Sequence, residues 1–347
     1  MSHTNEDHAA QFARARQMEA DGRHDIARRL FTELSQRGDI EALTALGMNM
    51  LVREPLEQFE GVKAVIDAAN KGGAEAIGFC GTMSALGAGL PLNWTMALDC
   101  LQASAERNWQ PAQSELRLLA GQTGDAWKPL RDAIDMPALL KPATLREVHT
   151  TPRVSVAENF LSPELCDWLV ARAKPKITRA KTYNPRGAVS PDDSRNNSAT
   201  EFNFVEMDIV LALIRARIAA AAGLPPTGME NPQVLHYATG QSFAPHYDFL
   251  DVRQPGVPET IAQGGQRQAT FLVYLNDDFD GAETSFLKLD WRYRGGKGDA
   301  ILFWNTAPDN TPDMASLHAG LAPTRGEKWL LSQWIRRAPS RGPVQTS

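Results

Sequence analysis

Two residues of metal-ligand type stand two positions apart in the segment His246-Tyr247-Asp248. A third, His318, lies 70 residues beyond Asp248, and Lys328 follows ten residues later. Two imidazoles and one carboxylate are typical of non-haem Fe(II) sites, which keep coordination positions open for other ligands. The spacing therefore predicts an Fe(II) centre formed by His246, Asp248 and His318, with a nearby cation for an acidic cosubstrate.

The residues around the triplet have the pattern of a β-strand over residues 242–248, which would put His246 and Asp248 on one face. His318 lies in a later short run just before Gly320, and we expect it to complete the set from an opposite wall of a barrel. An isolated triplet of this kind also arises by chance. The alternative interpretation is a half-buried histidine beside an ordinary turn aspartate.

Lys328 begins the last predicted strand, and Leu330, Ser332 and Trp334 follow it on the same face at a period of two. A buried lysine is unfavourable unless it is paired. At the end of an inward-facing row, its partner would be the far carboxylate of a dicarboxylate ligand. The row therefore predicts an anion site at one end of the cavity.

Three further side chains are candidates for ligand binding. Tyr237 lies nine residues before His246, and a hairpin that bends at Gly240 would bring its phenol into the same cavity as a second donor. Arg195 and Arg267 could clamp a substrate carboxylate, because guanidinium groups bind carboxylates in a bidentate way. Structural salt bridges are the alternative role for both arginines.

The C-terminal half is built from short apolar runs that glycine, proline and aspartate separate. We predict strands over residues 233–238, 242–248, 269–276, 284–287, 299–304, 316–318 and 328–336. No helical crossovers lie between them, which favours a β-sandwich or barrel over a parallel α/β sheet. Two helices come before these strands, over about residues 163–174 and 205–222.

The first 120 residues have helical periodicity and an internal repeat. The repeated elements are Gly38-x-x-x-Ala42, Gly72-x-x-x-Ala76 and Asn108-x-x-x-Ala112. A period near 35 residues resembles tetratricopeptide or SEL-type helical repeats, and an irregular helical bundle is the alternative. We predict a repeat domain over 1–125, a linker or docking segment over 126–151, a catalytic domain over 152–338 and a tail over 339–347.

Composition restricts the classes of partner. A net charge of −5 does not favour binding to nucleic acid or to an anionic membrane. Three widely spaced cysteines argue against a disulfide framework, and no apolar leader or membrane span is visible. We therefore expect a cytoplasmic protein. The helical repeats could bind a protein partner or form a dimer contact.

Five segments resemble the prolyl 4-hydroxylase family of 2-oxoglutarate-dependent dioxygenases, in the same order and spacing. They are residues 236–248, 267–276, 281–284, 317–320 and 326–336. The resemblance covers residues 155–337. It implies an α+β fold, in which a double-stranded β-helix with flanking helices follows the helical repeats. One departure is Ala282, where the family usually has a glycine; alanine is tolerated there unless the position requires positive φ.

The resemblance also assigns roles to individual residues. By it, the Fe(II) ligands would be His246, Asp248 and His318. Lys328 would bind the far carboxylate of 2-oxoglutarate with help from Tyr237 and Thr284, and Trp334 would line the substrate side. The implied cofactors are Fe(II), 2-oxoglutarate and O2, with ascorbate as a candidate reductant.

The expected reaction is hydroxylation of an unactivated C–H bond, with release of succinate and CO2. Related halogenases lack the carboxylate ligand, so the presence of Asp248 favours hydroxylation. The resemblance implies a proline-like substrate, either a prolyl residue of a peptide or protein or a free imino or amino acid. Hydroxylation of an arginine-like or lysine-like substrate, or an interaction protein with a vestigial oxygenase domain, are the alternatives.

Overall fold

The computed structural model describes residues 2–52, 55–180, 182–183, 189–190 and 195–337. The chain divides into two compact units. Unit 1 comprises Met1–Leu140 with Asn203–Ile214, and unit 2 comprises Lys141–Phe202 with Arg215–Ser347. The predicted tail over 339–347 lies outside the described residues. The segment 126–151 contains two short helices and the first strand, and the proposed domain boundaries stay a prediction.

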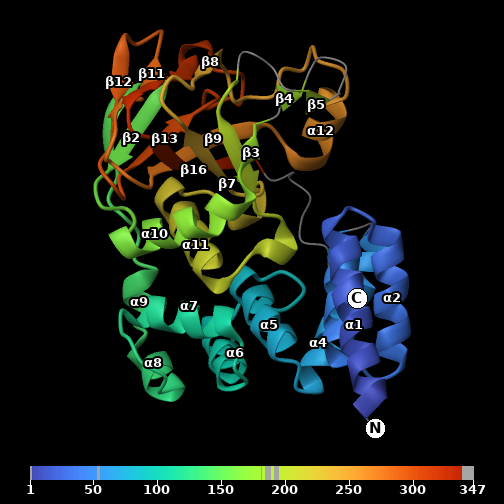
Figure 1. Cartoon of the computed structure of the whole chain (residues 1–347). Coiled ribbons are helices and arrows are strands. Elements are labelled where there is room, and N and C mark those ends of the chain that lie inside the picture. The colour runs from blue at the N-terminus through green and yellow to red at the C-terminus, as the bar shows by residue number, and fades with distance from the viewer. Residues whose placement is uncertain (1, 53–54, 181, 184–188, 191–194, 338–347) are drawn as a thin grey trace. The chain divides into compact units, whose positions relative to one another are not determined.

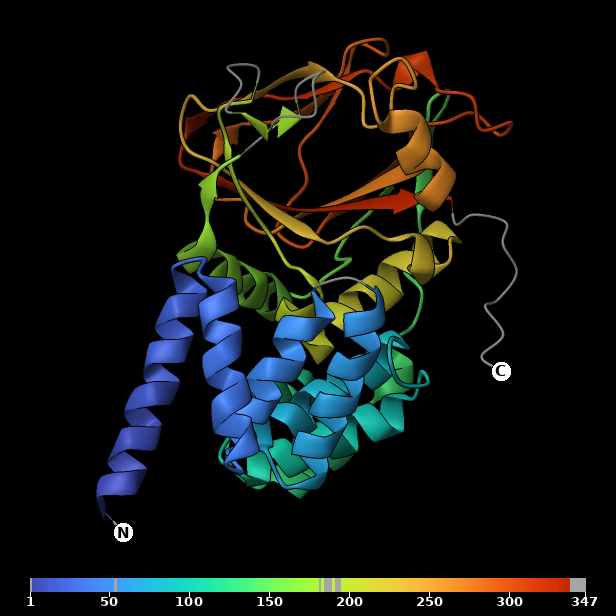
Figure 2. The same cartoon turned by 90° about the vertical axis from the view of Figure 1, so that its right-hand side faces the viewer.

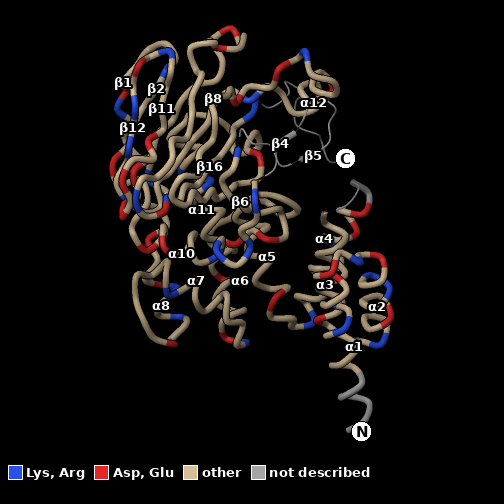
Figure 3. Tube along the Cα trace, turned by 45° about the horizontal axis from the view of Figure 1, so that its top comes forward, with Lys and Arg blue, Asp and Glu red and all other residues tan. Residues whose placement is uncertain are grey.

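Unit 1 is helical (Figures 1 and 2). Its helices are α1 (Ser2–Ala20), α2 (His24–Gln36), α3 (Ile40–Leu51), α4 (Pro55–Asn70), α5 (Ala74–Leu86), α6 (Trp94–Glu106), α7 (Gln110–Ala120), α8 (Trp127–Ala133) and α9 (Met136–Leu139). Acidic and basic residues are interspersed over α1 to α4 (Figure 3). Among the described residues, no helix has both the length and the apolar character that a membrane span needs.

The sequence repeat corresponds to a structural repeat in unit 1. Positive φ angles occur at Gly38 (91°), Gly72 (92°) and Asn108 (63°). Each of these residues follows one helix, and the alanine four positions later is buried in the next helix. A left-handed residue ends a helix and lets the chain reverse. Asparagine tolerates this conformation better than most residues, which explains how the third repeat manages without glycine.

Residues 203–214 come late in the sequence but belong to unit 1. The ring of Phe204 lies 5.7 Å from that of Phe79 in an edge-on contact. The backbone N–H of Ile209 donates to Glu115 Oε2 at 2.9 Å, so a buried carboxylate satisfies an N–H in the first turn of α11 (Ile209–Ala222). The chain therefore leaves unit 2 and returns to it within this short segment.

Unit 2 contains two main antiparallel sheets. The larger has the order β1 (Arg146–Thr150), β2 (Arg153–Ala157), β13 (Ala300–Trp304), β9 (Arg267–Tyr274), β16 (Lys328–Arg336), β7 (Gln233–Tyr237), β6 (Ser198–Glu201) and β3 (Thr178–Arg179). The smaller has the order β12 (Trp291–Tyr293), β11 (Thr284–Phe286), β14 (His318–Gly320) and β8 (Phe243–His246). Two ribbons pair β4 (Thr182–Tyr183) with β5 (Val189–Ser190), and β10 (Asp280–Gly281) with β15 (Pro323–Arg325).

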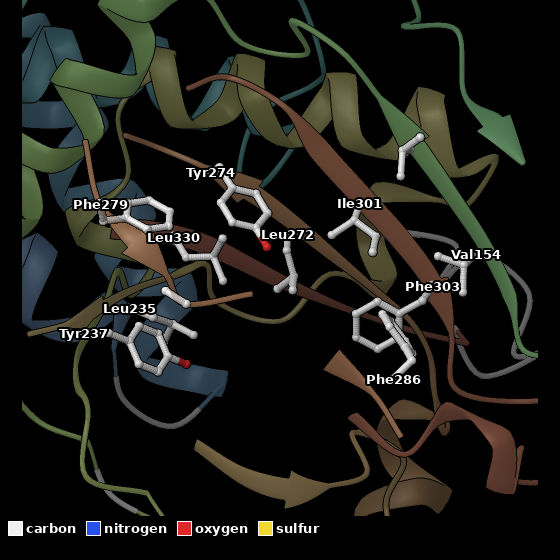
Figure 4. Close-up of a cluster of buried hydrophobic side chains, with 12 residues drawn as sticks. Val154, Leu235, Tyr237, Leu272, Tyr274, Phe279, Phe286, Ile301, Phe303 and Leu330 are labelled. Atoms are coloured by element: carbon white, nitrogen blue, oxygen red, sulfur yellow. The ribbon is translucent and has the colours of Figure 1, made fainter. Parts of the chain in front are cut away.

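The predicted α+β class is confirmed, and the two facing sheets form the double-stranded β-helix that the resemblance implied. Strands occur in six of the predicted runs; the seventh, 316–318, is only partly right, because Met314–Ser316 forms a 3-10 helix and the strand begins at His318. The apolar core lies between the sheets, where Leu272 and Tyr274 of β9 and Phe303 of β13 meet Phe286 of β11 (Figure 4). This core holds the two sheets at a fixed separation, and the site described below occupies the same interior.

Helices cover the outer face of the larger sheet. The helix predicted over 163–174 is α10 (Pro163–Ala173), which Ser162 caps and which has Pro163 at its first helical position. At the middle of α11, Arg215 donates to the side-chain oxygen of Gln333 at 3.1 Å. Gln333 of β16 therefore points to the helical side, while its neighbours Ser332 and Trp334 line the interior. A further helix, α12 (Val257–Gly264), follows the triplet segment.

Candidate active site

The two predicted histidine ligands lie on neighbouring strands. β8 pairs with β14, and His246 stands directly opposite His318 in the register. The expectation that His318 approaches from an opposite wall is therefore wrong: both histidines come from the smaller sheet. Asp248 lies two residues beyond the end of β8, and the ligand atoms of the three residues all lie within 4.8 Å of one another.

Both imidazole rings are fixed in the same tautomer. His246 Nδ1 lies 2.8 Å from Ala244 O, and His318 Nδ1 lies 3.0 Å from Ser316 O. A carbonyl oxygen only accepts, so each Nδ1 carries a hydrogen, and in the neutral ring the lone pair is therefore on Nε2. The Nε2 atoms lie 3.6 Å from the oxygens of Asp248. Two lone pairs and one carboxylate thus converge on one point, as a divalent metal requires.

The electrostatics favour the ligand form of His246 and Asp248. Burial, followed by the charge of His318, lowers the pKa of His246 to about 3, so its imidazole is neutral. Burial by itself raises the pKa of Asp248, but His318, His246 and a hydrogen bond from Thr270 outweigh it and lower the pKa overall. Neutral imidazoles and an ionised carboxylate are the protonation states that bind a metal.

Lys328 is a buried cation at the other end of the interior. Its side chain is 1% exposed, and Nζ donates to Ala282 O at 2.8 Å. Burial lowers its pKa from 10.5 to about 7, and the charge of Glu283 only partly opposes this. Within the described part of the chain, no carboxylate lies within ion-pair distance of Nζ. An anion that enters the cavity would stabilise the charged form of such a lysine.

Ala282, which accepts the Lys328 hydrogen bond, has a strained backbone. Its φ is 58°, and it follows Gly281 with a φ of 71°. A non-glycine residue in the left-handed region costs roughly 1–2 kcal/mol. The position where the family usually has a glycine therefore does require positive φ, and alanine adopts it here under strain. The strained turn directs the Ala282 carbonyl at the lysine.

Tyr237 enters the cavity by a different route from the expected one. β7 and β8 do not form a hairpin: β7 pairs with β6 and β16, and β8 pairs with β14. The turn at Gly240 (φ 81°) carries the chain from one sheet to the other. Tyr237 stands opposite Lys328 in the β16 register and is 2% exposed. Burial raises its pKa to about 12, so the phenol remains a hydrogen-bond donor.

Thr284 lines the cavity, but its hydroxyl hydrogen is already engaged. Tyr274 OH donates to Tyr293 O at 2.9 Å and also lies 2.9 Å from Thr284 Oγ1. A phenol has one hydrogen, so the Thr284 hydroxyl must donate to Tyr274. Among the three anion-binding candidates, Lys328 and Tyr237 are therefore better prepared to donate to a ligand than Thr284.

A single cavity brings most of the predicted residues together. It encloses about 420 Å³ of empty space, part of it open to solvent. Of the predicted site residues, those that line it are His246, Asp248, His318, Lys328, Tyr237, Thr284, Trp334 and Arg195. The larger sheet supplies Lys328, Leu330, Ser332 and Trp334 from one strand, as their alternation predicts. The cavity thus has a metal-ligand set and a buried cation in one interior.

Arg195 is a cavity arginine without a carboxylate partner among the described residues. It is 6% exposed, its Nε donates to Asn197 Oδ1 at 3.1 Å, and its guanidinium lies over the Phe243 ring at 4.6 Å. Phe243 in turn stacks on His246 with ring centroids 3.6 Å apart. Sequence reasoning missed Phe243, because an aromatic residue in a strand is ordinary core material.

Arg267 stands outside the cavity lining. It donates to both oxygens of Glu230, at 2.6 and 2.8 Å, and Arg336 donates to the same carboxylate at 2.7 Å. The guanidinium of Arg267 lies 3.6 Å from the centre of the Trp334 ring. In this arrangement Arg267 has a structural salt bridge, and its contact with the cavity runs through Trp334.

The chain is similar to known 2-oxoglutarate- and Fe(II)-dependent oxygenases. The family model of the 2OG-Fe(II) oxygenase superfamily matches residues 232–336. Probable prolyl 4-hydroxylase 3 of Arabidopsis thaliana is 35% identical over 204 residues, which cover 53% of this chain and 69% of the relative. Prolyl 4-hydroxylase 5 of the same plant is 36% identical over 204 residues, covering 53% of this chain and 68% of the relative.

Among solved structures, a viral collagen prolyl hydroxylase from Paramecium Bursaria Chlorella virus-1, in its 2OG complex, is 29% identical. It covers 53% of this chain and 96% of that chain, with a TM-score of 0.41. The expected cofactors, Fe(II), 2-oxoglutarate and O2, are those of the matched superfamily. On the sequence matches, the chain belongs to the prolyl 4-hydroxylase family of 2-oxoglutarate- and Fe(II)-dependent oxygenases.

Proposed function

We propose that this enzyme hydroxylates prolyl residues of a peptide or protein, using Fe(II), 2-oxoglutarate and O2 and releasing succinate and CO2. The observation that carries the proposal is the shared cavity. Three potential ligands lie within 4.8 Å of one another, and a buried lysine without a carboxylate partner among the described residues lines the same space. A metal-chelating dicarboxylate would engage both features at once.

His246, Asp248 and His318 would hold the metal. The donor set fits Fe(II), because both Nε2 lone pairs are available and the carboxylate is ionised. When bound, Fe(II) supplies the redox chemistry by which O2 and 2-oxoglutarate hydroxylate a C–H bond. The protein's own contribution is to orient the reactants and to limit the access of water.

Lys328 and Tyr237 would bind the far carboxylate of 2-oxoglutarate. The Lys328 ammonium, which donates to Ala282 O, would donate to the ligand carboxylate, and the Tyr237 phenol would add a neutral donor. A charged partner stabilises the ammonium form in this buried place. Thr284 would assist only if its hydroxyl turns away from Tyr274.

The cavity favours a neutral substrate side chain such as proline. Asp248 is the only carboxylate that lines it within the described part of the chain, and that residue belongs to the metal set. A lysine-like or arginine-like substrate would need a further acid. Trp334 and Arg195, with Arg267 behind the indole, would lie on the substrate side. The relatives' names, prolyl 4-hydroxylases, support the same substrate class.

The test is turnover of defined substrates by the full chain. Fe(II), 2-oxoglutarate and ascorbate are supplied with proline-containing peptides or with free proline, and both succinate and the mass gain of one oxygen are measured. We expect hydroxylation of a peptide at proline. Hydroxylation of free proline alone would contradict the peptide assignment, and absence of succinate with every substrate would support a vestigial oxygenase instead.

The affinity for 2-oxoglutarate should fall as the pH rises above about 7. Lys328 has a pKa of about 7 in the ligand-free protein, and a bound carboxylate would raise it, so binding takes up a proton above that pH. Below pH 7 the lysine is already charged, and the affinity should level off. The slope should approach roughly ten-fold per pH unit.

Calorimetry on the Mn(II)-loaded protein in buffers of different ionisation enthalpy measures both the affinity and the proton uptake. The metal is kept saturating, so that the pH dependence of metal binding does not contribute. The Lys328→Met variant is the control and should lose the uptake. An affinity that is constant from pH 6 to pH 9 would contradict the role of this lysine.

Tyr237→Phe should weaken 2-oxoglutarate binding more than Thr284→Val does. Among the described residues, no hydrogen-bond partner is seen for the Tyr237 phenol, whereas the threonine hydrogen is engaged with Tyr274. Loss of one hydrogen bond to a charged group corresponds to about 1.5–3 kcal/mol, or more than ten-fold in affinity. The Kd of each variant for 2-oxoglutarate checks the order, and the reverse order would show that Thr284 is the main assisting donor.

Two further proposals concern the partners of the helical repeats and the cellular compartment. The helical repeats would offer a surface to a protein partner or to a second copy, and sedimentation of the full chain distinguishes monomer from dimer. We also propose a reducing, cytoplasmic setting, because all three cysteines are free thiols. Fractionation of the cells that produce the protein would test this location.

A further inference from the structure

A polar pair from the larger sheet holds the carboxylate of Asp248. Thr270 Oγ1 lies 2.7 Å from Asp248 Oδ2, and Asn305 Nδ2 lies 2.9 Å from Thr270 Oγ1. Asp248 is 5% exposed, Thr270 is 1% exposed and Asn305 is fully buried. Thr270 belongs to β9, and Asn305 directly follows β13, the neighbouring strand. The pair therefore reaches the metal-ligand set from the sheet that does not carry the histidines.

The direction of both hydrogen bonds follows from Asp248. An ionised carboxylate only accepts, so the Thr270 hydroxyl must donate to it. The hydroxyl has a single hydrogen, so the Asn305 amide must donate to Thr270. This orientation leaves Asn305 Oδ1 buried without a partner among the described residues. An unpaired buried acceptor is unfavourable, so the amide keeps this orientation because Asp248 requires it.

We propose that Thr270 and Asn305 are positioning residues for the carboxylate ligand, an inference that rests on the proposed metal-dependent function. Asn305 directs the Thr270 hydrogen, and Thr270 fixes the rotation of the Asp248 carboxylate. Each carboxylate oxygen is thereby kept 3.6 Å from one histidine Nε2. Without the hydroxyl, the carboxylate is free to turn about its last bond, and the ligand set loses its fixed geometry. Partners that orient a metal ligand typically contribute about 10–100-fold to metal affinity.

Metal binding by the full chain tests this independently of turnover. Mn(II) is titrated into the metal-free protein, and the visible spectrum of the Co(II) form is recorded. Thr270→Val keeps the shape but removes the hydroxyl, and it should bind Mn(II) about 10–100-fold more weakly with an altered Co(II) spectrum. Thr270→Ser restores the hydroxyl and should restore both properties.

Asn305→Leu separates positioning from stability. It removes the amide that directs Thr270, and with it the unpaired carbonyl, so we expect weaker Mn(II) binding without a lower melting temperature. A merely structural residue would not lower metal affinity while leaving the melting temperature intact. This variant also carries the test should Thr270→Val not fold.

The outcomes are distinct. If the wild-type chain binds no metal, the proposed function fails. If it binds metal and Thr270→Val or Asn305→Leu binds as tightly with an unchanged spectrum, the positioning proposal is overturned while the proposed function stands. Equal weakening in Thr270→Ser and Thr270→Val also overturns it, because the hydroxyl would not then be the feature that matters.

Discussion

Replacing His246 by alanine is expected to remove hydroxylation and succinate formation together. The substitution takes away one of two imidazole ligands that, with Asp248, form the proposed metal-ligand set. Two remaining ligands cannot hold Fe(II) in a defined geometry. The hydroxylated product and succinate both depend on the metal. We therefore expect turnover to fall by at least roughly 10³-fold, as it does when one member of a catalytic group that acts together is removed.

His236 offers a matched control for this substitution. It lies in β7, binds Glu327 through its Nε2 at 2.7 Å and packs on Trp329. It does not line the cavity, so His236→Ala should leave Fe(II) binding and turnover nearly unchanged. Succinate release and Mn(II) affinity are measured for both variants. Comparable activity in His246→Ala and the wild-type protein would rule out the proposed metal site.

Replacing Lys328 by methionine is expected to separate function from stability. Methionine is close to lysine in length and carries no charge, so it removes the cation that would bind the far carboxylate. Losing a hydrogen-bonded ion pair in a buried site costs about 3–5 kcal/mol, which is more than 100-fold in 2-oxoglutarate affinity. Metal affinity should stay the same, because Lys328 is not one of the three candidate metal ligands.

The stability of the Lys328→Met protein should move the other way. In the ligand-free protein, burial lowers the lysine pKa to about 7, which means that the folded state disfavours its charge. Above that pH the folded state holds the amine neutral, and below it the charge must be buried. The variant should therefore melt at a higher temperature, most clearly below pH 7. A lower melting temperature with unchanged 2-oxoglutarate affinity would show that Lys328 has only a structural role.

The sequence predicted the cavity row of β16 because one long strand carries it. Side chains alternate between the two faces of a strand. Once Lys328 is assigned to the cavity, Leu330, Ser332 and Trp334 must therefore face the cavity as well. The same reasoning could not predict which strands pair. The position of His318 beside His246 depends on contact between residues 72 positions apart, and nothing in either segment specifies its neighbour.

Other features leave no local mark in the sequence. The positive φ of Ala282 is set by the turn between β10 and β11, and alanine gives no sign of it. Thr270 looks like an ordinary β-branched strand residue, and its contact with Asp248 requires knowledge of both sheets. β1 was not predicted because it is an edge strand with mostly exposed side chains, so it lacks the alternation of a half-buried strand.

The return of residues 203–214 to unit 1 affects how this protein can be divided. A shortened chain that begins at Lys141 would retain Phe204 and the first turns of α11 without Phe79 and Glu115, their partners. Apolar surface and a backbone N–H would then be exposed to water, which favours aggregation. We therefore expect that one cleavage after the repeats would not give a well-folded oxygenase. Evolutionary exchange of the repeats between proteins would likewise have to carry this internal segment along.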